Sequence, residues 1–240
     1  MKKAYLSALL VIAGFGVASL SSCEDNCIQG SGHQITETRK VVDFKKIDIS
    51  GSFKVILKQD SSLTVTITAD DNIMKHIKTP VKDGELYIKN KRGACNAGET
   101  VVTIGVHNLD EISTSGSNEV SSNGTLVTKD LSIGMSGDSK ITLNLNAANV
   151  TTDGSGSSEL YLTGQASSHK IDFSGDGKLS AYGFVVGDYD IETSGSSDCE
   201  VNVLHNLHVS TSGSSDIKYK GNPSNVTNDK SGSSDLQKVN

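Results

Sequence analysis

The sequence predicts an all-β fold: a single-domain, right-handed parallel β-helix with coils of about 19 residues, preceded by a cleaved lipoprotein signal peptide. Three observations lead to this prediction: a phrase that recurs about every 19 residues, apolar-polar alternation on both sides of it, and a hydrophobic content of only 35% without Trp. A solenoid buries only a narrow apolar column, so this composition is compatible with one folded domain. We expect a signal peptide at 1–22, a lipidated N-terminal linker at 23–40 and the β-helix domain at 41–240.

The recurring phrase is a Ser-Gly pair followed by two small or polar residues, a charged residue and an apolar residue. Apolar residues also recur four and six positions before and after its glycine, which predicts two short strands around a Ser-Gly corner. A second corner rich in Gly, Asn and Asp would close each coil, and the handedness of parallel crossovers favours the right-handed form. The glycines are spaced by 21, 19, 19, 20, 18 and 19 residues: Gly116, Gly137, Gly156, Gly175, Gly195, Gly213 and Gly232.

The chain before the regular repeat has the same β character in less regular form. Runs of β-branched residues predict strands at 53–57, 63–67 and 101–106, with a further strand at 85–89. Residues 71–78 place three apolar side chains on one helical face before Pro80, so they predict a short helical turn. We expect these elements to form the first coils of the same parallel solenoid.

Stacking of the coils would turn the charged position of the phrase into a ladder. Its sign alternates over the first four coils, so stacked neighbours are expected to attract weakly. The last three coils place Asp198, Asp216 and Asp235 above one another. These carboxylates either point into water, which we favour, or share a cation such as calcium. In the final repeat, Asn228 and Lys230 replace apolar inward residues, which predicts a polar cap. The full ladder is Glu119, Lys140, Glu159, Lys178, Asp198, Asp216 and Asp235.

The N-terminus predicts export and membrane attachment. A basic start at residues 1–3 and an apolar run at 8–20 are typical of a signal peptide. Leu20-Ser21-Ser22-Cys23 resembles the lipobox of bacterial lipoproteins, which implies cleavage before Cys23 and acylation of its thiol and amine. Several acyl chains anchor firmly, so the expected partner is a membrane. The acidic pair at 24–25 resembles a short surface-export signal of Bacteroidetes lipoproteins, so we expect an outer-membrane lipid anchor, with the cell surface favoured over the periplasmic face.

Three cysteines remain after the lipidation site. Cys199 occupies the apolar position of the phrase and is expected to be a buried small hydrophobe rather than a nucleophile. Cys27 and Cys95 lie in polar segments of a protein expected in an oxidising compartment. They either form a disulfide that ties the N-terminal segment to the body or remain exposed thiols.

The chain resembles the putative auto-transporter adhesin, head GIN domain family, which occurs largely in secreted and lipid-anchored proteins of Bacteroidetes. The resemblance rests on the segment Phe44–Gly51, the segment Val81–Ile88 and the Ser-Gly-Ser phrases, and it extends approximately over residues 42–225. It implies a right-handed β-helix and an extracellular or periplasmic location. It carries over no activity and no catalytic residue.

The sequence favours a noncatalytic surface binding module or adhesin. The net charge of −6 argues against nucleic acid as a partner, whereas rows of Ser, Thr, Asn and Asp suit a glycan, a matrix protein or another envelope protein. A structural or sensing envelope lipoprotein is the alternative. The oligomeric state stays open.

A β-helix polysaccharide lyase or hydrolase is the less favoured hypothesis. It would need a carboxylate pair such as Asp172 with Asp176 or Asp188 with Asp190, but such spacings are common in turns. The six histidines are scattered, and even the pair His205 and His208 is a poor candidate for metal binding. We therefore expect no catalytic residue, no metal ligand and no cofactor. The few Tyr and Phe residues make a sugar-stacking groove unpromising.

Overall fold

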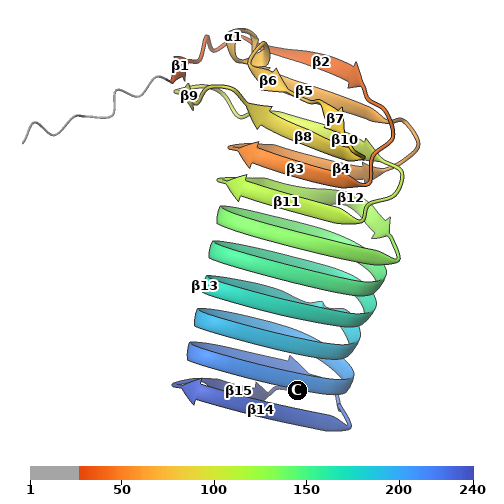
Figure 1. Ribbon diagram of the computed structural model, residues 1–240, viewed down its shortest axis with the longest axis vertical. Helices are drawn as coiled ribbons and strands as arrows, with labels where there is room; N and C mark the ends of the chain where they lie inside the picture. The colour runs from red at the N-terminus through yellow and green to blue at the C-terminus, as the bar shows by residue number, and fades with distance from the viewer. Residues whose placement is uncertain (1–26) are drawn as a thin grey trace, which may run out of the picture.

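The computed structural model describes residues 27–240, so the expected signal peptide at 1–22 and the lipidation site Cys23 lie outside the described residues. The described chain is all-β apart from α1 (Asp71–Met74), and this four-residue helix is too short to cross a membrane (Figure 1). The strands are β1 (Ile28–Gln29), β2 (Gln34–Lys40), β3 (Lys46–Gly51), β4 (Lys54–Gln59), β5 (Thr64–Asp70), β6 (Ile77–Lys78), β7 (Val81–Lys82), β8 (Glu85–Asn90), β9 (Ala94–Cys95), β10 (Val101–Val106), β11 (Glu111–Gly116), β12 (Glu119–Val127), β13 (Asp130–Lys220), β14 (Asn225–Gly232) and β15 (Asp235–Lys238).

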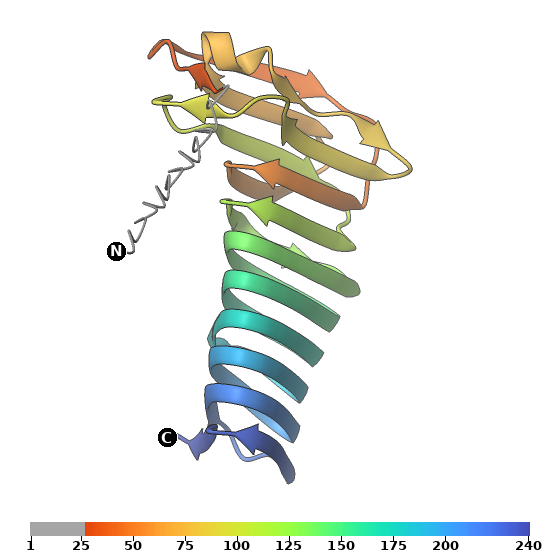
Figure 2. The ribbon, with the colours of Figure 1, turned by 60° about the vertical axis from the view of Figure 1, so that its left-hand side comes forward.

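The long strand β13 builds most of the molecule by winding back on itself. Its 91 residues would extend to about 300 Å if they were straight, at about 3.3 Å per residue. Instead, Figures 1 and 2 show β13 passing through a stack of turns between the N-terminal sheet elements and the C-terminus. β11 and β14 pair in parallel with β13, and the register places Gly116 opposite Gly137 and Gly213 opposite Gly232. One repeat of the sequence therefore lies directly on the next.

The Ser-Gly corners bring the backbones of successive turns close together. Gly137 has a φ of +83°, and a Cβ added there would lie 2.8 Å from the carbonyl oxygen of Gly116. A side chain at this position would meet both backbone strain and the backbone of the neighbouring turn. This contact explains why glycine recurs at the corner.

The core is the apolar column enclosed by the stacked turns. Alternate residues of β13 are buried, including Ile133, Ile141 and Leu160, as the period-two pattern predicted. Large aromatic side chains also fill the column, with Phe173 and Phe184 fully buried. The column ends at β14, in which every residue is exposed.

The N-terminal end of the stack differs from the predicted parallel coils, because its sheet is mixed. β5 pairs antiparallel with both β2 and β10, and β8 pairs antiparallel with β6 and β7. Asp83 and Gly84 between β7 and β8 have φ values of +52° and +76°, which produce a tight hairpin. A two-residue hairpin can join only antiparallel strands, since parallel strands need a longer crossover. The expectation of parallel coils alone from residue 41 onward was therefore wrong. Parallel pairing does occur here, since β3 pairs in parallel with β8 and β11, and β4 with β10 and β12.

The segment expected as a linker also contributes to the sheet. β2 pairs along its length with β5, and the Thr36 and Thr68 hydroxyls lie 2.9 Å apart across the pair. Alternating threonines suit such a half-exposed antiparallel pair, a signal that the polar composition of 23–40 concealed. The folded part therefore begins before residue 41. The helical turn expected at 71–78 ends at Met74, because Ile77 and Lys78 pair with β8 instead.

Candidate functional surface

The corners use part of their polar groups internally and present the rest to solvent. The Ser139 hydroxyl donates to the carbonyl oxygen of Ser136 at 3.3 Å, and Ser158 donates to that of Ser155 at 3.4 Å. Ser139 and Ser158 are buried, so these bonds satisfy the turn rather than a ligand. The outward side chains of the turns are the groups available for binding.

The charged ladder forms in the predicted register but not with the predicted pairing. Glu119 lies opposite Lys140 in the parallel pair of β12 and β13. However, the Nζ atoms of Lys140 and Lys178 lie 5.0 Å and 5.8 Å from the ring centroid of Tyr161, and no ladder residue of 27–240 forms an ion pair. The two lysines therefore interact with an aromatic face between them. The Tyr161 hydroxyl donates to Glu159 at 3.0 Å, which holds the ring in place.

The C-terminal carboxylates of the ladder line a shallow groove. Asp216 lies opposite Asp235, and Asp198 and Asp216 line a groove of about 430 Å³ together with corner serines. Across residues 27–240 the structure groups no three His, Cys, Asp or Glu side chains in a position to hold a metal ion. The geometry thus provides solvent-facing acidic rows rather than a preformed cation site.

Two tyrosines from different positions of the repeat meet in a second groove, which we call the tyrosine groove. It has a volume of about 420 Å³ and is lined by Tyr161, Tyr182 and the amide side chain of Asn144. Lys220 lies over Tyr182, with Nζ 4.7 Å from the ring centroid. Both tyrosines are half-buried, which fixes the rings while leaving part of each accessible. The remaining lining residues are Ser122, Gly124, Thr142, Leu143, Leu162, Thr163, Ser180 and Gly183.

The tyrosine groove is a feature that the sequence interpretation missed. Tyrosine is scarce in the chain, and this scarcity argued against an aromatic groove. Tyr161 and Tyr182 are nevertheless separated by 21 residues, which is one repeat plus two, and residues two apart on a strand share a face. This spacing was the available signal.

The structure does not assemble the carboxylate pairs weighed for an enzyme. Asp172 and Asp176 lie on either side of a corner and line two different grooves. Asp188 accepts a hydrogen bond from Asn206 at 2.5 Å, whereas Asp190 faces Lys170 at 3.8 Å. Asp172 and Asp176 are thus divided between two grooves, whereas Asp188 and Asp190 share a strand face but have different polar partners.

Within residues 27–240, no histidine belongs to a group of three side chains that could hold a metal ion. His208 approaches Asp190 at 4.0 Å and contacts the Thr227 hydroxyl at 2.7 Å, so it belongs to an exposed cross-turn polar row. His169 is fully buried, contacts the Thr152 hydroxyl at 2.9 Å and packs against the Tyr189 ring at a centroid distance of 5.3 Å. Burial lowers the pKa of His169 to about 3, so the imidazole is neutral in the core. Its role is structural.

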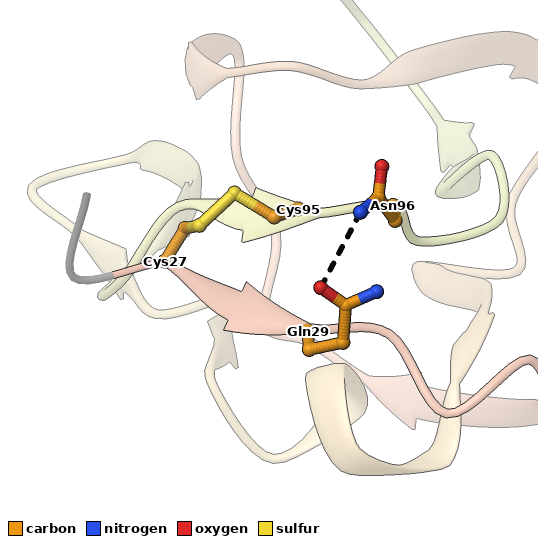
Figure 3. The surroundings of a disulfide bond; sticks show 4 residues. All are labelled: Cys27, Gln29, Cys95 and Asn96. Atoms are coloured by element: carbon orange, nitrogen blue, oxygen red, sulfur yellow. Dashed lines mark hydrogen bonds between the residues drawn. A yellow bond between two sulfur atoms is a disulfide. The ribbon is translucent and has the colours of Figure 1, made fainter.

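A disulfide joins the N-terminal segment to the loop after β8 (Figure 3). Cys27 and Cys95 have Cα atoms 5.6 Å apart, and β1 pairs in parallel with β9 beside the bond. The Asn96 amide donates to Gln29 at 3.4 Å across the same pair. Cys199 is buried as expected, and burial raises the pKa of its thiol to about 12. The start of the described chain is thereby fixed against β9.

The fold and its surface define a class of protein: an all-β stack whose long polar face offers shallow grooves. The chain belongs to the family described as putative auto-transporter adhesin, head GIN domain, whose model matches residues 43–223. The resemblance stated from the sequence is therefore confirmed. No curated protein matches the sequence.

Solved structures share the fold. A putative adhesin from Bacteroides fragilis is 25% identical, with a TM-score of 0.79 over 88% of this chain and 100% of its own. A putative adhesin from Parabacteroides distasonis is 20% identical, with a TM-score of 0.71 over 89% of this chain and 100% of its own. Another from Parabacteroides merdae is 19% identical, with a TM-score of 0.63 over 89% of this chain and 99% of its own. The family and the Bacteroides fragilis structure support a cell-surface or envelope protein of the adhesin type.

Proposed function

We propose that this protein is a noncatalytic, lipid-anchored adhesin of the bacterial cell envelope that binds a glycan through the tyrosine groove. The observation that carries the proposal is the meeting of Tyr161 and Tyr182 in one groove of polar amide and hydroxyl groups. Tyrosine supplies a flat apolar face with a polar tip, which suits a pyranose ring with its alternating C–H and O–H surfaces. Asn144 and Thr163 would provide donors and acceptors for sugar hydroxyls.

The groove has the physical features of a weak or multivalent binding site. It is shallow, so one sugar unit would bury little surface. Lys178 and Lys220 beside the tyrosine rings favour a glycan that carries carboxylate or sulfate groups. Adhesion between surfaces tolerates weak single contacts, because many copies bind at once.

The proposed architecture is a right-handed parallel β-helix with coils of about 19 residues over the repeat region. Parallel pairing of β11, β12, β14 and β15 with β13 supports it, as does the one-repeat register between corner glycines. In such a helix each turn repeats the outward positions of the last, so grooves form wherever small residues interrupt a ladder. Gly124 and Gly183 interrupt the ladders at the tyrosine groove.

The proposed anchor is Cys23 at the end of the lipobox-like segment. The basic and apolar segments before it support cleavage of residues 1–22, and the adhesin family supports an envelope location. We place the domain on the outer face of the outer membrane. Antibody labelling of intact and permeabilised cells tests this, with Cys23→Ala as the control that loses surface retention; labelling only after permeabilisation would place the domain inside.

The binding proposal is tested on an array of acidic and neutral glycans with the full chain. The double variant Tyr161→Ala/Tyr182→Ala should weaken binding at least fivefold, since buried tyrosines at interfaces are commonly worth more than about 1 kcal/mol each. Tyr87→Ala is the matched control, because Tyr87 is equally half-buried but lies on β8, away from the groove. Equal binding by both variants would move the site to another face.

Absence of glycan binding by the native chain would instead favour the structural or sensing role. An enzyme is less favoured, because Asp172 and Asp176 lie in separate grooves. Release of reducing or unsaturated sugar ends by the purified protein would overturn the noncatalytic proposal.

A further inference from the structure

A group of cations lines a groove at the N-terminal end of the stack, although the chain as a whole carries a net charge of −6. The groove has a volume of about 450 Å³, and its charged lining residues are Arg39, Lys78, Lys82, Lys89 and Lys91. Three of the four lysines are exposed and Lys78 is half-buried. We call this feature the basic groove.

The antiparallel pairs of the N-terminal sheet bring these lysines together. In the register of β6 with β8, Lys78 lies directly opposite Lys89. Like charges opposite one another on paired strands destabilise the sheet. In the part of the chain that the structure describes, none of Lys78, Lys82, Lys89 and Lys91 forms an ion pair with a carboxylate. Lys82 instead lies opposite Glu85 in the register of β7 with β8. The repulsion that a bound anionic surface would relieve is therefore that between Lys78 and Lys89.

Arg39 has a different role from the lysines. Its guanidinium is paired with Glu37 at 2.8 Å and donates to the carbonyl oxygen of Ile77 at 2.9 Å. These contacts hold β2 against β6 at the base of the groove. Lys78 donates from Nζ to the carbonyl oxygen of Lys75 at 3.0 Å, and Lys89 Nζ lies 5.0 Å from the Tyr87 ring centroid. The positive charges of the lysines thus remain without a carboxylate partner in the described residues.

The pKa of a neighbouring histidine reflects the positive electrostatic potential at this end of the stack. Partial burial lowers the pKa of His76, and nearby cations lower it further: Lys75, Arg92, Lys78 and Lys91. The positive field thus extends beyond the groove itself to Lys75 and Arg92. Anionic surfaces are attracted to fields of this kind.

The basic groove is also close to the proposed anchor along the chain. Lys91 and Cys95 are four residues apart, which limits their Cα separation to about 14 Å. Cys95 is bonded to Cys27, and Cys27 is again four residues from Cys23, with the same limit of about 14 Å. The opposite end of the stack, where the chain terminates, is the far end in both views (Figures 1 and 2). The Cα atoms of Cys23 and Lys91 are therefore at most about 34 Å apart, so a membrane that holds Cys23 is within reach of the basic groove.

We propose that the basic groove docks the domain onto the anionic phosphate headgroups of the membrane that carries its lipid anchor. This inference rests on the proposed anchoring at Cys23. Lysines near an anionic bilayer add attraction to that of an acyl anchor, and each is worth about a fivefold change in the ratio of docked to undocked protein. Docking at this end would direct the long polar face and the tyrosine groove away from the membrane surface.

The test uses the mature lipidated protein in two kinds of vesicle, one of phosphatidylcholine alone and one with a quarter of phosphatidylglycerol. Exposed lysines are acetylated by a water-soluble reagent and quantified by mass spectrometry. We expect Lys78, Lys82, Lys89 and Lys91 to react severalfold more slowly on the anionic vesicles. Internal controls are Lys129, Lys218, Lys230 and Lys238, which are exposed elsewhere on the stack and should not change.

Salt and charge variants separate docking from simple crowding. In 1 M NaCl, where the Debye length is about 3 Å, the protection should disappear. On anionic vesicles, docking should also slow amide hydrogen exchange in β8. The variant Lys78→Gln/Lys82→Gln/Lys89→Gln/Lys91→Gln should lose this slowing. The control variant Lys129→Gln/Lys218→Gln/Lys230→Gln/Lys238→Gln should keep it. Equal reactivity of the groove lysines on both vesicles would overturn the docking proposal.

The outcome distinguishes docking from anchoring. A protein that floats with phosphatidylcholine vesicles but shows no lipid-dependent protection is anchored and does not dock. A protein that fails to float with phosphatidylcholine vesicles lacks the anchor, and the proposed function then fails independently. Protection by soluble inorganic phosphate at equal strength would assign the groove to a free anion and overturn the membrane assignment.

Discussion

Replacement of a corner glycine tests the stacking of turns most directly. Gly137→Ala introduces a Cβ 2.8 Å from the Gly116 carbonyl oxygen, at a φ of +83°. The left-handed conformation costs an L-residue about 1–2 kcal/mol, and forcing a methyl group against fixed backbone adds about 1–3 kcal/mol. We expect Gly137→Ala to lower the free energy of unfolding by about 3 kcal/mol.

The matched control is Gly84→Ala in the hairpin between β7 and β8. Gly84 has a similar φ of +76°, but a Cβ added there meets nothing within 4 Å. It therefore includes the conformational cost of about 1–2 kcal/mol without the contact between turns. Urea denaturation followed by circular dichroism measures both variants. If the two variants lose the same stability within about 0.5 kcal/mol, glycine recurs for its conformation alone and the contact argument fails.

Two further perturbations probe the core and the covalent link. The pKa of His169 is about 3 in the fold against 6.5 for the free group, so its stability contribution is complete above pH 6.5 and is lost as the pH falls toward 3. The free energy of unfolding, measured with urea, should be about 2 kcal/mol lower at pH 5 than at pH 7. His169→Phe should reduce this pH dependence. A variant with the same pH dependence as the native chain would contradict the buried neutral imidazole. The Cys27–Cys95 disulfide spans a sequence separation of 68 residues, so its reduction should lower the free energy of unfolding by about 4 kcal/mol in the loop-entropy model. If Cys27→Ser/Cys95→Ser is as stable as the native chain, the bond constrains the unfolded chain little.

The repeat region was predictable because its information is local. A strand alternates with period two, and a corner at which backbones approach closely requires glycine. The stacking register of residues 113–236 can therefore be predicted from the local pattern, without reference to distant parts of the chain. The burial of Ile141 and the pairing of Gly116 with Gly137 follow from that pattern. The family could likewise be predicted from the segments around Phe44 and Val81, and the family model confirms it.

The N-terminal end was less predictable because its pairing partners are distant and its turns decide strand direction. The pattern of residues 34–40 is compatible with a polar linker, and only the partner strand β5 makes it a strand. The sequence analysis did not identify the Asp83-Gly84 hairpin, although an Asp-Gly pair between two short apolar-polar runs is typical of a turn that reverses the strand. Antiparallel pairs with β2, β5, β6 and β7 consequently join the parallel pairs of β3, β4, β8 and β10 at this end.

The sequence by itself determined the all-β class, the period of the stack, the family and the residues that face the core, because each depends on alternation and spacing along the chain. Only the tertiary structure decided which surface residues meet: Tyr161 with Tyr182, Lys78 with Lys89, and Cys27 with Cys95. Side chains on successive turns become neighbours according to the exact length of each turn, and spacings that vary between 18 and 21 residues shift that register. The physical reason is that function on a stacked sheet depends on adjacency between turns, which is set by the folded backbone and not by any one repeat.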